Sequence, residues 1–235
     1  VLPCLVPRGL EVQVRDLDRA LRSLLRGGVD AADLYFQASR HEAWSLEDGI
    51  VKEGSHSIEQ GVGVRALSGD RTGFAYSDEI VVPALMQAAD AASAIARAGQ
   101  QGALQAWTLR QGRELYAPLD PIPSLSDDDK VALLQRVDQA TRAIDSRVKQ
   151  VMASLVAVHE VVLVCGSDGV LAADVRPLVR MNVSVLVEDG GRREQGYTGG
   201  GGRGSFQHFL EQDRAFAYGR EAVRQALVAL EAVPP

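Results

Sequence analysis

The sequence has little cysteine, no long apolar run and no excess of positive charge. Its two cysteines, Cys4 and Cys165, are too few for a disulfide framework. No apolar stretch approaches the roughly 20 residues of a membrane span. The 25 lysines and arginines are outnumbered by 31 aspartates and glutamates, for a net charge of −6, so no global basic field attracts nucleic acid. These absences predict a soluble, intracellular protein with no nucleic-acid partner and no membrane partner.

The remaining composition is that of a folded protein. Apolar residues make up 46% and charged residues 24% of the 235 residues, values that argue against general disorder. A chain of this length makes one large domain or two small ones and buries a sizeable core. Composition by itself gives no information about chemistry.

The first part of the chain predicts a helix, a run of antiparallel strands, a second helix and a connector. Apolar residues recur at spacings of four and three and then give way to strict alternation with polar residues, which separates helix from strand. Turn chemistry at Ser68-Gly69-Asp70-Arg71 predicts a hairpin. These elements are expected at residues 10–24, 32–39, 43–46, 58–67, 72–76, 83–98 and 99–123.

The second part repeats this order. Ser126 followed by Asp127, Asp128 and Asp129 predicts a capped helix start, and the apolar spacing continues that helix through Ile144 to Val148. We then expect paired strands at 151–158 and 160–165, an alternating strand at 178–187, a turn at 188–191 and a helix at 216–230. The prediction is an α+β fold with helices packed on antiparallel or mixed sheets, in two α+β halves, residues 1–125 and 126–235.

The residues that most often carry catalysis show no catalytic spacing. His41-Glu42 lacks the second histidine of a zinc helix, because position 45 is serine. His56, His159 and His208 lie far apart in sequence without a nearby cysteine, so ordinary surface or packing roles are expected. Cys165 ends an apolar strand and is predicted to be a buried, inert thiol. No metal site and no catalytic residue is predicted within this chain.

Two glycine-rich segments stand out. The run Gly199, Gly200, Gly201, Gly202 with Arg203 is interpreted as a flexible connection between the last strand and the last helix. Its alternative is a bare backbone that another extended chain approaches closely, which makes these five residues candidate peptide contacts.

The second segment is Gly61-Val62-Gly63-Val64-Arg65. Glycine within a strand often marks a bulge or a close backbone contact. Arg65 is expected either on a solvated face or paired with an acid, where it could orient a carboxylate.

Several of these segments, in this order, resemble the TldD/PmbA family, whose members are also called modulators of DNA gyrase. The chain is most similar to the amino-terminal domain of its TldD branch, and the resemblance covers essentially its whole length. The matching segments are residues 32–37, 41–42, 46–48, 60–66, 72–76, 168–169, 172–180 and 199–203.

The resemblance implies a zinc-dependent peptidase that acts on unfolded or leader-type peptides. It also implies a cytoplasmic dimer, formed with an identical chain or with a PmbA-like (TldE-like) subunit. In the family, the zinc ligands lie in a His-Glu-x-x-x-His helix, with a further contribution from a carboxyl-terminal domain, and no position in this sequence corresponds to that helix. We therefore expect a non-catalytic amino-terminal domain that shapes the substrate path and the dimer. The alternative is a stand-alone binding or regulatory module that acts on a gyrase-related or antitoxin-related protein.

Overall fold

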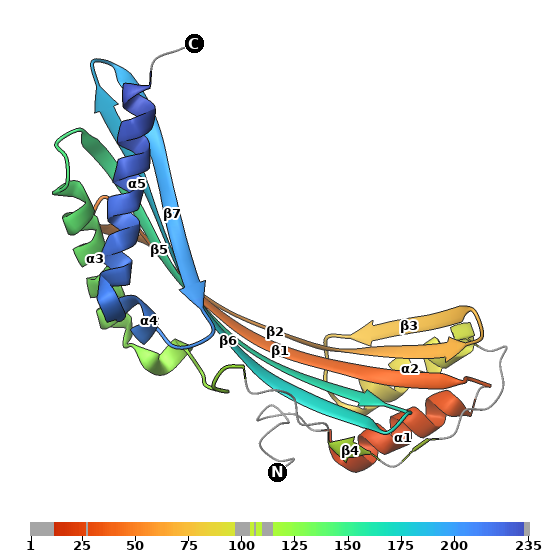
Figure 1. The fold of residues 1–235 in the computed structure, drawn as a ribbon. Coiled ribbons are helices and arrows are strands. Elements are labelled where there is room, and N and C mark those ends of the chain that lie inside the picture. Colours follow the sequence, from red (N-terminus) through yellow and green to blue (C-terminus); the bar gives the residue numbers. More distant parts are fainter. Residues whose placement is uncertain (1–11, 27, 97–103, 106, 110–114, 233–235) are drawn as a thin grey trace. The chain divides into compact units, whose positions relative to one another are not determined.

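The computed structural model of the protein (Figure 1) describes residues 12–26, 28–96, 104–105, 107–109 and 115–232. The chain forms two compact units, each assembled from three separate stretches. The first unit comprises Val1–Ser39, Ile58–Leu115 and Glu160–Val175; the second comprises Arg40–Ser57, Tyr116–His159 and Arg176–Pro235. The units are therefore interleaved along the sequence, and the division into two α+β halves at residue 125 stays a prediction.

Within the described residues, seven strands form one hydrogen-bonded sheet. The strands are β1 (Ala31–Glu47), β2 (Ile50–Ser68), β3 (Arg71–Ser77), β4 (Thr108–Leu109), β5 (Val148–Gly166), β6 (Val170–Asp189) and β7 (Arg192–Gly202). Their order is β3-β2-β1-β5-β6-β4, and β7 also pairs with β6. The β2–β3 and β6–β7 pairs are antiparallel, whereas β4 runs parallel to β6. The expected α+β class with an antiparallel or mixed sheet is confirmed.

In the first unit, two helices cover one face of the sheet (Figure 1). Helix α1 (Val14–Leu25) buries Leu21 and Leu24, and helix α2 (Val82–Ala96) buries Leu85 and the alanines at positions 88, 89, 92 and 96. The closest approach is at Gly73 of β3, where a Cβ atom would lie 2.0 Å from the carbonyl oxygen of Ala92. Because β3 has no side chain at this point, α2 packs directly on its backbone.

In the second unit, helices α3 (Asp127–Arg142) and α5 (Arg214–Glu231) pack on the sheet (Figure 1). Ser126 caps α3 as expected, since its Oγ accepts a hydrogen bond from the Asp129 amide at 3.2 Å. The core joins buried residues of α3, β5, β6 and α5, such as Val137, Leu155, Met181 and Val223. Three short helical turns complete the unit: Ile122–Ser124, Gln207–Leu210 (α4) and Glu211–Asp213.

The turns predicted at 68–71 and 188–191 are confirmed. Gly69 has positive φ between β2 and β3, and Asp48 and Gly49 also have positive φ between β1 and β2. At the β6–β7 turn, Gly190 and Gly191 have φ of 57° and 84°. Two successive positive φ angles characterise the tight hairpin turn that matches the twist of the strands, which explains the paired glycines.

Three expectations about the ends of elements are wrong. The paired strands expected at 151–158 and 160–165 are one strand, β5, because no turn residue interrupts them. The separate extended stretches at 32–39 and 43–46 are likewise one strand, β1. Helix α3 ends at Arg142 rather than continuing to Val148.

The early end of α3 has a local cause. The backbone turns at Asp145, whose carboxylate accepts a hydrogen bond from the Arg147 amide at 2.9 Å. Ile144 is 44% exposed, and Val148 already belongs to β5.

Some predicted features lie outside the described residues. They are Leu10 of the first helix, Ala98 of the second, most of the connector expected before residue 115, and Cys4. None of the described helices is long and apolar enough to cross a bilayer.

Candidate functional site

The outer face of strands β1, β2 and β3 in the first unit carries exposed aromatic side chains. Alternation along β1 turns Leu34 and Phe36 towards the helices, so Tyr35 between them lies on the opposite face. On β3, Gly73 faces α2, and its neighbour Phe74 therefore lies on the outer face. Tyr35, Phe74 and Tyr76 are 39%, 57% and 78% exposed. This face has no helical cover in Figure 1.

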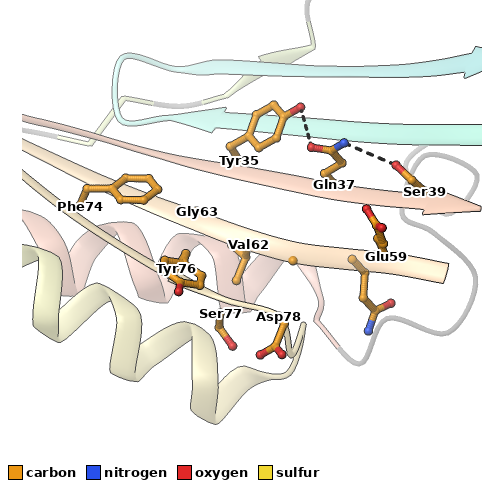
Figure 2. A pocket seen from close by; sticks show the side chains of 12 residues that line it. Tyr35, Gln37, Ser39, Glu59, Val62, Gly63, Phe74, Tyr76, Ser77 and Asp78 are labelled. Atoms are coloured by element: carbon orange, nitrogen blue, oxygen red, sulfur yellow. Dashed lines mark hydrogen bonds between the residues drawn. The ribbon is translucent and has the colours of Figure 1, made fainter. Parts of the chain in front are cut away.

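The outer face is hollowed into an open groove of about 440 Å³. Figure 2 shows Tyr35, Gln37 and Ser39 in a row along β1, with Phe74 on the other side of Gly63. Twelve residues line the groove: Tyr35, Gln37, Ser39, Glu59, Gln60, Gly61, Val62, Gly63, Phe74, Tyr76, Ser77 and Asp78.

Hydrogen bonds along β1 fix one wall of the groove. The Tyr35 hydroxyl donates to Gln37 Oε1 at 3.4 Å, and Gln37 Nε2 donates to Ser39 Oγ at 3.4 Å. The same Nε2 donates to Glu160 Oε2 at 2.7 Å. Because every polar atom of the Gln37 amide is engaged, this wall is pre-organised rather than free to collapse into the groove.

Two glycines form the floor. A Cβ atom at Gly61 would lie 3.0 Å from the Ser77 carbonyl oxygen, and one at Gly63 would lie 3.3 Å from the Phe74 ring. The register of β2 and β3 is continuous from Val62 to Ser68, so Gly63 lies in a regular ladder and marks a close contact rather than a bulge. Of the two alternatives predicted for these glycines, a bulge or a close contact, the close contact is confirmed. Because Gly63 has no side chain, the Phe74 ring can lie close to the backbone of β2.

Arg65, next along β2, forms an ion pair. Its guanidinium lies 2.6 Å from Asp33 Oδ2 on β1. Arg65 is exposed, as expected for a solvated face, and it also pairs with an acid, the alternative that the sequence left open.

The glycine run lies in a strand and is not a flexible linker. Gly199, Gly200, Gly201 and Gly202 form the end of β7 and pair with residues 179–182 of β6. Pairing with β6 gives the backbone regular hydrogen-bond partners, which outweighs the weak strand propensity of glycine. The linker interpretation is wrong for this reason.

Neighbouring elements explain why these positions are glycine. A Cβ atom at Gly200 would lie 2.4 Å from the Tyr218 hydroxyl of α5, and one at Gly201 would lie 2.0 Å from the Val179 carbonyl oxygen of β6. Arg203 stacks over the Tyr116 ring at 5.6 Å and donates to the Pro177 carbonyl at 3.3 Å. The role of residues 199–203 as peptide contacts remains a prediction.

The second unit holds a buried ion pair that sequence reasoning missed. Lys130 Nζ lies 2.6 Å from Glu42 Oε1 and 3.0 Å from Asp127 Oδ1, and it also lies over the Phe206 ring at 5.6 Å. A signal existed in the sequence, because Lys130 continues the buried spacing of α3 at positions 133, 134 and 137. The partner could not be found this way, since Glu42 is on a distant strand.

Among the described residues, the candidate reactive side chains do not gather into a cluster. The prediction that Cys165 is buried is confirmed, and burial raises the pKa of its thiol to about 12, which favours the less reactive protonated form. His159 lies beside Arg40 and Asp120; burial lowers its pKa, with the Asp120 charge opposing this and the Arg40 charge adding to it. His41 lies on β1 and His208 on α4, as parts of separate elements.

The described residues do not fit a catalytic metal. Among them, no three histidine, cysteine, aspartate or glutamate side chains come together in a way that could hold an ion. Metal-assisted hydrolysis needs at least such a set with an open position for water. No step of hydrolysis is therefore assigned to the described residues.

Two sequence profiles of one family match the chain. Residues 32–96 match domain 1, and residues 120–230 match the central domain, of the PmbA/TldA metallopeptidases. A metalloprotease TldD homologue of Haemophilus influenzae is 50% identical over 211 residues, which cover 87% of this chain and 44% of the relative. A TldD homologue of Buchnera aphidicola is 40% identical over 226 residues, covering 94% of this chain and 47% of the relative.

Solved structures share the fold at low sequence identity. One from Bacteroides thetaiotaomicron, described as a modulator of DNA gyrase, has a TM-score of 0.72 at 15% identity and covers 91% of this chain and 49% of its own. TldE from Thermococcus kodakarensis has a TM-score of 0.71 at 16% identity, and the match covers 94% of this chain and 49% of the TldE chain. The chain spans about half the length of the relatives it matches. The two matched domains follow one another along the chain in the order that the family has them. This chain therefore belongs to the PmbA/TldD metallopeptidase family and corresponds to its amino-terminal portion.

Proposed function

We propose that this chain is the non-catalytic, peptide-handling portion of a TldD-like zinc metallopeptidase that cleaves unfolded or leader peptides in the cytoplasm. The single observation that carries the proposal is the open groove on β1, β2 and β3, in a chain that belongs to a metallopeptidase family. A groove with an aromatic wall and a glycine floor suits an extended peptide, because main chain and side chains can both approach the sheet closely.

Sequence-tolerant peptide binding fits this surface. Ring faces bind apolar and cationic side chains with little demand on their order. The groove is open to solvent along its length, so the peptide does not have to thread into a closed cavity. The part of the enzyme that holds zinc and polarises water is supplied outside this chain, and the dimer forms with an identical chain or a PmbA-like (TldE-like) subunit.

The first test uses the full-length protein, with its partner subunit where one is required. Replacing Phe74 and Tyr76 with alanine removes exposed rings without opening the core, so we expect KM for an unstructured peptide to rise several-fold with kcat nearly unchanged. Ile95→Ala and Val228→Ala are matched controls, since these side chains are 57% and 58% exposed and lie away from the groove. Unchanged KM in the double variant would remove the groove from the substrate path.

A second test measures metal content. We expect one zinc per full-length chain and no stoichiometric zinc in the 235-residue chain, measured by elemental analysis after dialysis. Tight binding of zinc by the 235-residue chain would overturn its non-catalytic role.

A further inference from the structure

The groove carries negative charge without a matching cation. Its lining includes the carboxylates of Glu59 and Asp78 and no lysine, arginine or histidine. In Figure 2, Glu59 lies at the Ser39 end of the groove, and Asp78 follows Ser77 beyond the end of β3. Within the described part of the chain, neither carboxylate has a hydrogen-bond or ion-pair partner.

The other charges near the groove do not cancel this sign. Arg65 lies on the same face but is paired with Asp33, so its charge is already compensated. Glu160 accepts a hydrogen bond from Gln37 behind the wall. A cation entering the groove therefore meets the negative field of Glu59 and Asp78.

The aromatic walls add a second attraction for a cation. The faces of Tyr35, Phe74 and Tyr76 carry negative electrostatic potential and are exposed in the described structure. A guanidinium group suits such walls better than an ammonium group, because it is planar, stacks on rings and is more weakly hydrated. It also forms forked hydrogen bonds to a carboxylate.

We propose that the groove is a subsite for an arginine side chain of an extended peptide. The aliphatic stem lies over Gly61 and Gly63, the guanidinium stacks against the rings, and Glu59 and Asp78 supply the opposite charge. This inference rests on the proposed function, since it names the class of peptide that the same groove prefers. It is a preference for one side chain and leaves the rest of the peptide sequence free.

The experiment compares two labelled, unstructured peptides that differ at one position, arginine or citrulline. Citrulline keeps the shape and planarity of the side chain but removes its charge. Fluorescence anisotropy with the 235-residue chain at low salt is expected to show the arginine peptide binding about tenfold more tightly. The double substitution Glu59→Gln and Asp78→Asn is expected to reduce that preference to about twofold.

The control is Glu53→Gln with Asp70→Asn, which removes two exposed carboxylates outside the groove and should leave the preference intact. Equal binding of the two peptides by the unmodified chain, or no binding of either, would overturn the inference. So would a preference that survives Glu59→Gln with Asp78→Asn.

Cleavage by the full-length protein separates the two proposals. If the Phe74→Ala and Tyr76→Ala variant raises KM equally for both peptides and the unmodified enzyme shows no preference between them, the function stands and the arginine subsite falls. If that variant cleaves both peptides like the unmodified enzyme, both proposals fall.

Discussion

Lys130 Nζ on helix α3 lies 2.6 Å from Glu42 Oε1 on strand β1, and the two side chains are only 2% and 9% exposed. Trp44 Nε1 donates a second hydrogen bond to the same carboxylate oxygen at 3.1 Å. Removing both charges from water is costly, and their mutual attraction repays this only when geometry and hydrogen bonding are good. The pair joins α3 to the sheet of the second unit.

Lys130→Met is expected to destabilise the second unit. It leaves the Glu42 carboxylate buried without its cation, which costs about 3–5 kcal/mol of unfolding free energy. Urea unfolding followed by tryptophan fluorescence measures this. The chain has two tryptophans, and Trp107 lies in the first unit, so a Trp107→Phe background makes Trp44 report the second unit alone.

The matched variant is Lys130→Met with Glu42→Gln, which removes both charges and keeps an acceptor for Trp44. We expect it to be more stable than Lys130→Met alone. Equal stability of the two variants would show that the loss comes from packing of the lysine stem and not from the unpaired carboxylate.

Gly196→Ala is expected to loosen α5 from β7. A Cβ atom at this position would lie 1.9 Å from the Ala222 carbonyl oxygen and 2.8 Å from the Ala226 nitrogen, both backbone atoms of α5. A helix backbone cannot move aside as a side chain can, so the overpacking should cost about 1–3 kcal/mol. Thermal unfolding measures the loss.

Two neighbouring substitutions calibrate this result. At Gly200 the nearest atom is the Tyr218 hydroxyl, the end of a side chain, so Gly200→Ala should cost less than Gly196→Ala. Gly204 has open space around its Cβ direction, and Gly204→Ala should be nearly neutral. A uniform cost at all three positions would contradict the packing argument.

Cys165 is expected to resist alkylation in the folded protein. Burial raises the pKa of its thiol to about 12, so almost no thiolate, the reactive form, exists at neutral pH. In a Cys4→Ser background, mass spectrometry after iodoacetamide treatment should find no adduct on the native chain and one adduct in urea. Rapid labelling of the native chain would show that the site opens.

The same pKa shift makes stability depend on pH in the alkaline range. The native thiol holds its proton more tightly than an unfolded thiol, whose ordinary pKa is 9.0. Its contribution is therefore complete below that pH and is lost as the pH rises towards about 12. Cys165→Ala should show a shallower loss of stability over this interval than the unmodified chain, as measured by urea unfolding at a series of pH values.

Ser126→Ala is expected to lower stability by about 1 kcal/mol, because it removes the acceptor for the Asp129 amide at the start of α3. Ser126→Thr restores a hydroxyl that can accept from the Asp129 amide and donate to the Asp129 carboxylate, as the Ser126 hydroxyl does. Its melting temperature should return close to that of the unmodified chain, and failure to do so would argue against capping as the cause.

Local patterns in the sequence were sufficient for the elements whose signals are local. The Ser126 cap, the Gly190-Gly191 turn and the alternation of β6 all depend on residues within a few positions of one another. The same local reasoning failed at residues 158–160, where one strand continues through a stretch that was expected to separate two strands. Strand ends depend on what the neighbouring strand offers, which a short window does not contain.

The candidate site divides in the same way. The glycines at 61 and 63 were recognisable as unusual residues in a strand, and the need for close contact there followed from their missing side chains. The groove itself was not predictable, because it combines β1, β2 and β3 side chains whose shared face depends on register. The glycine run at 199–202 misled local reasoning, since its pairing with β6 and its contact with α5 are long-range.

By itself, the sequence determined the helices, the tight turns, the α+β class and the family, because hydrophobic period, turn chemistry and ordered motifs are properties of the chain read in one dimension. Only the tertiary structure decided which face of β1–β3 stays uncovered, that Lys130 meets Glu42, and why β7 ends in four glycines. Each of these depends on the approach of segments far apart along the chain. Burial, charge pairing and steric contact form only when these distant segments meet, so a short stretch of sequence does not reveal them.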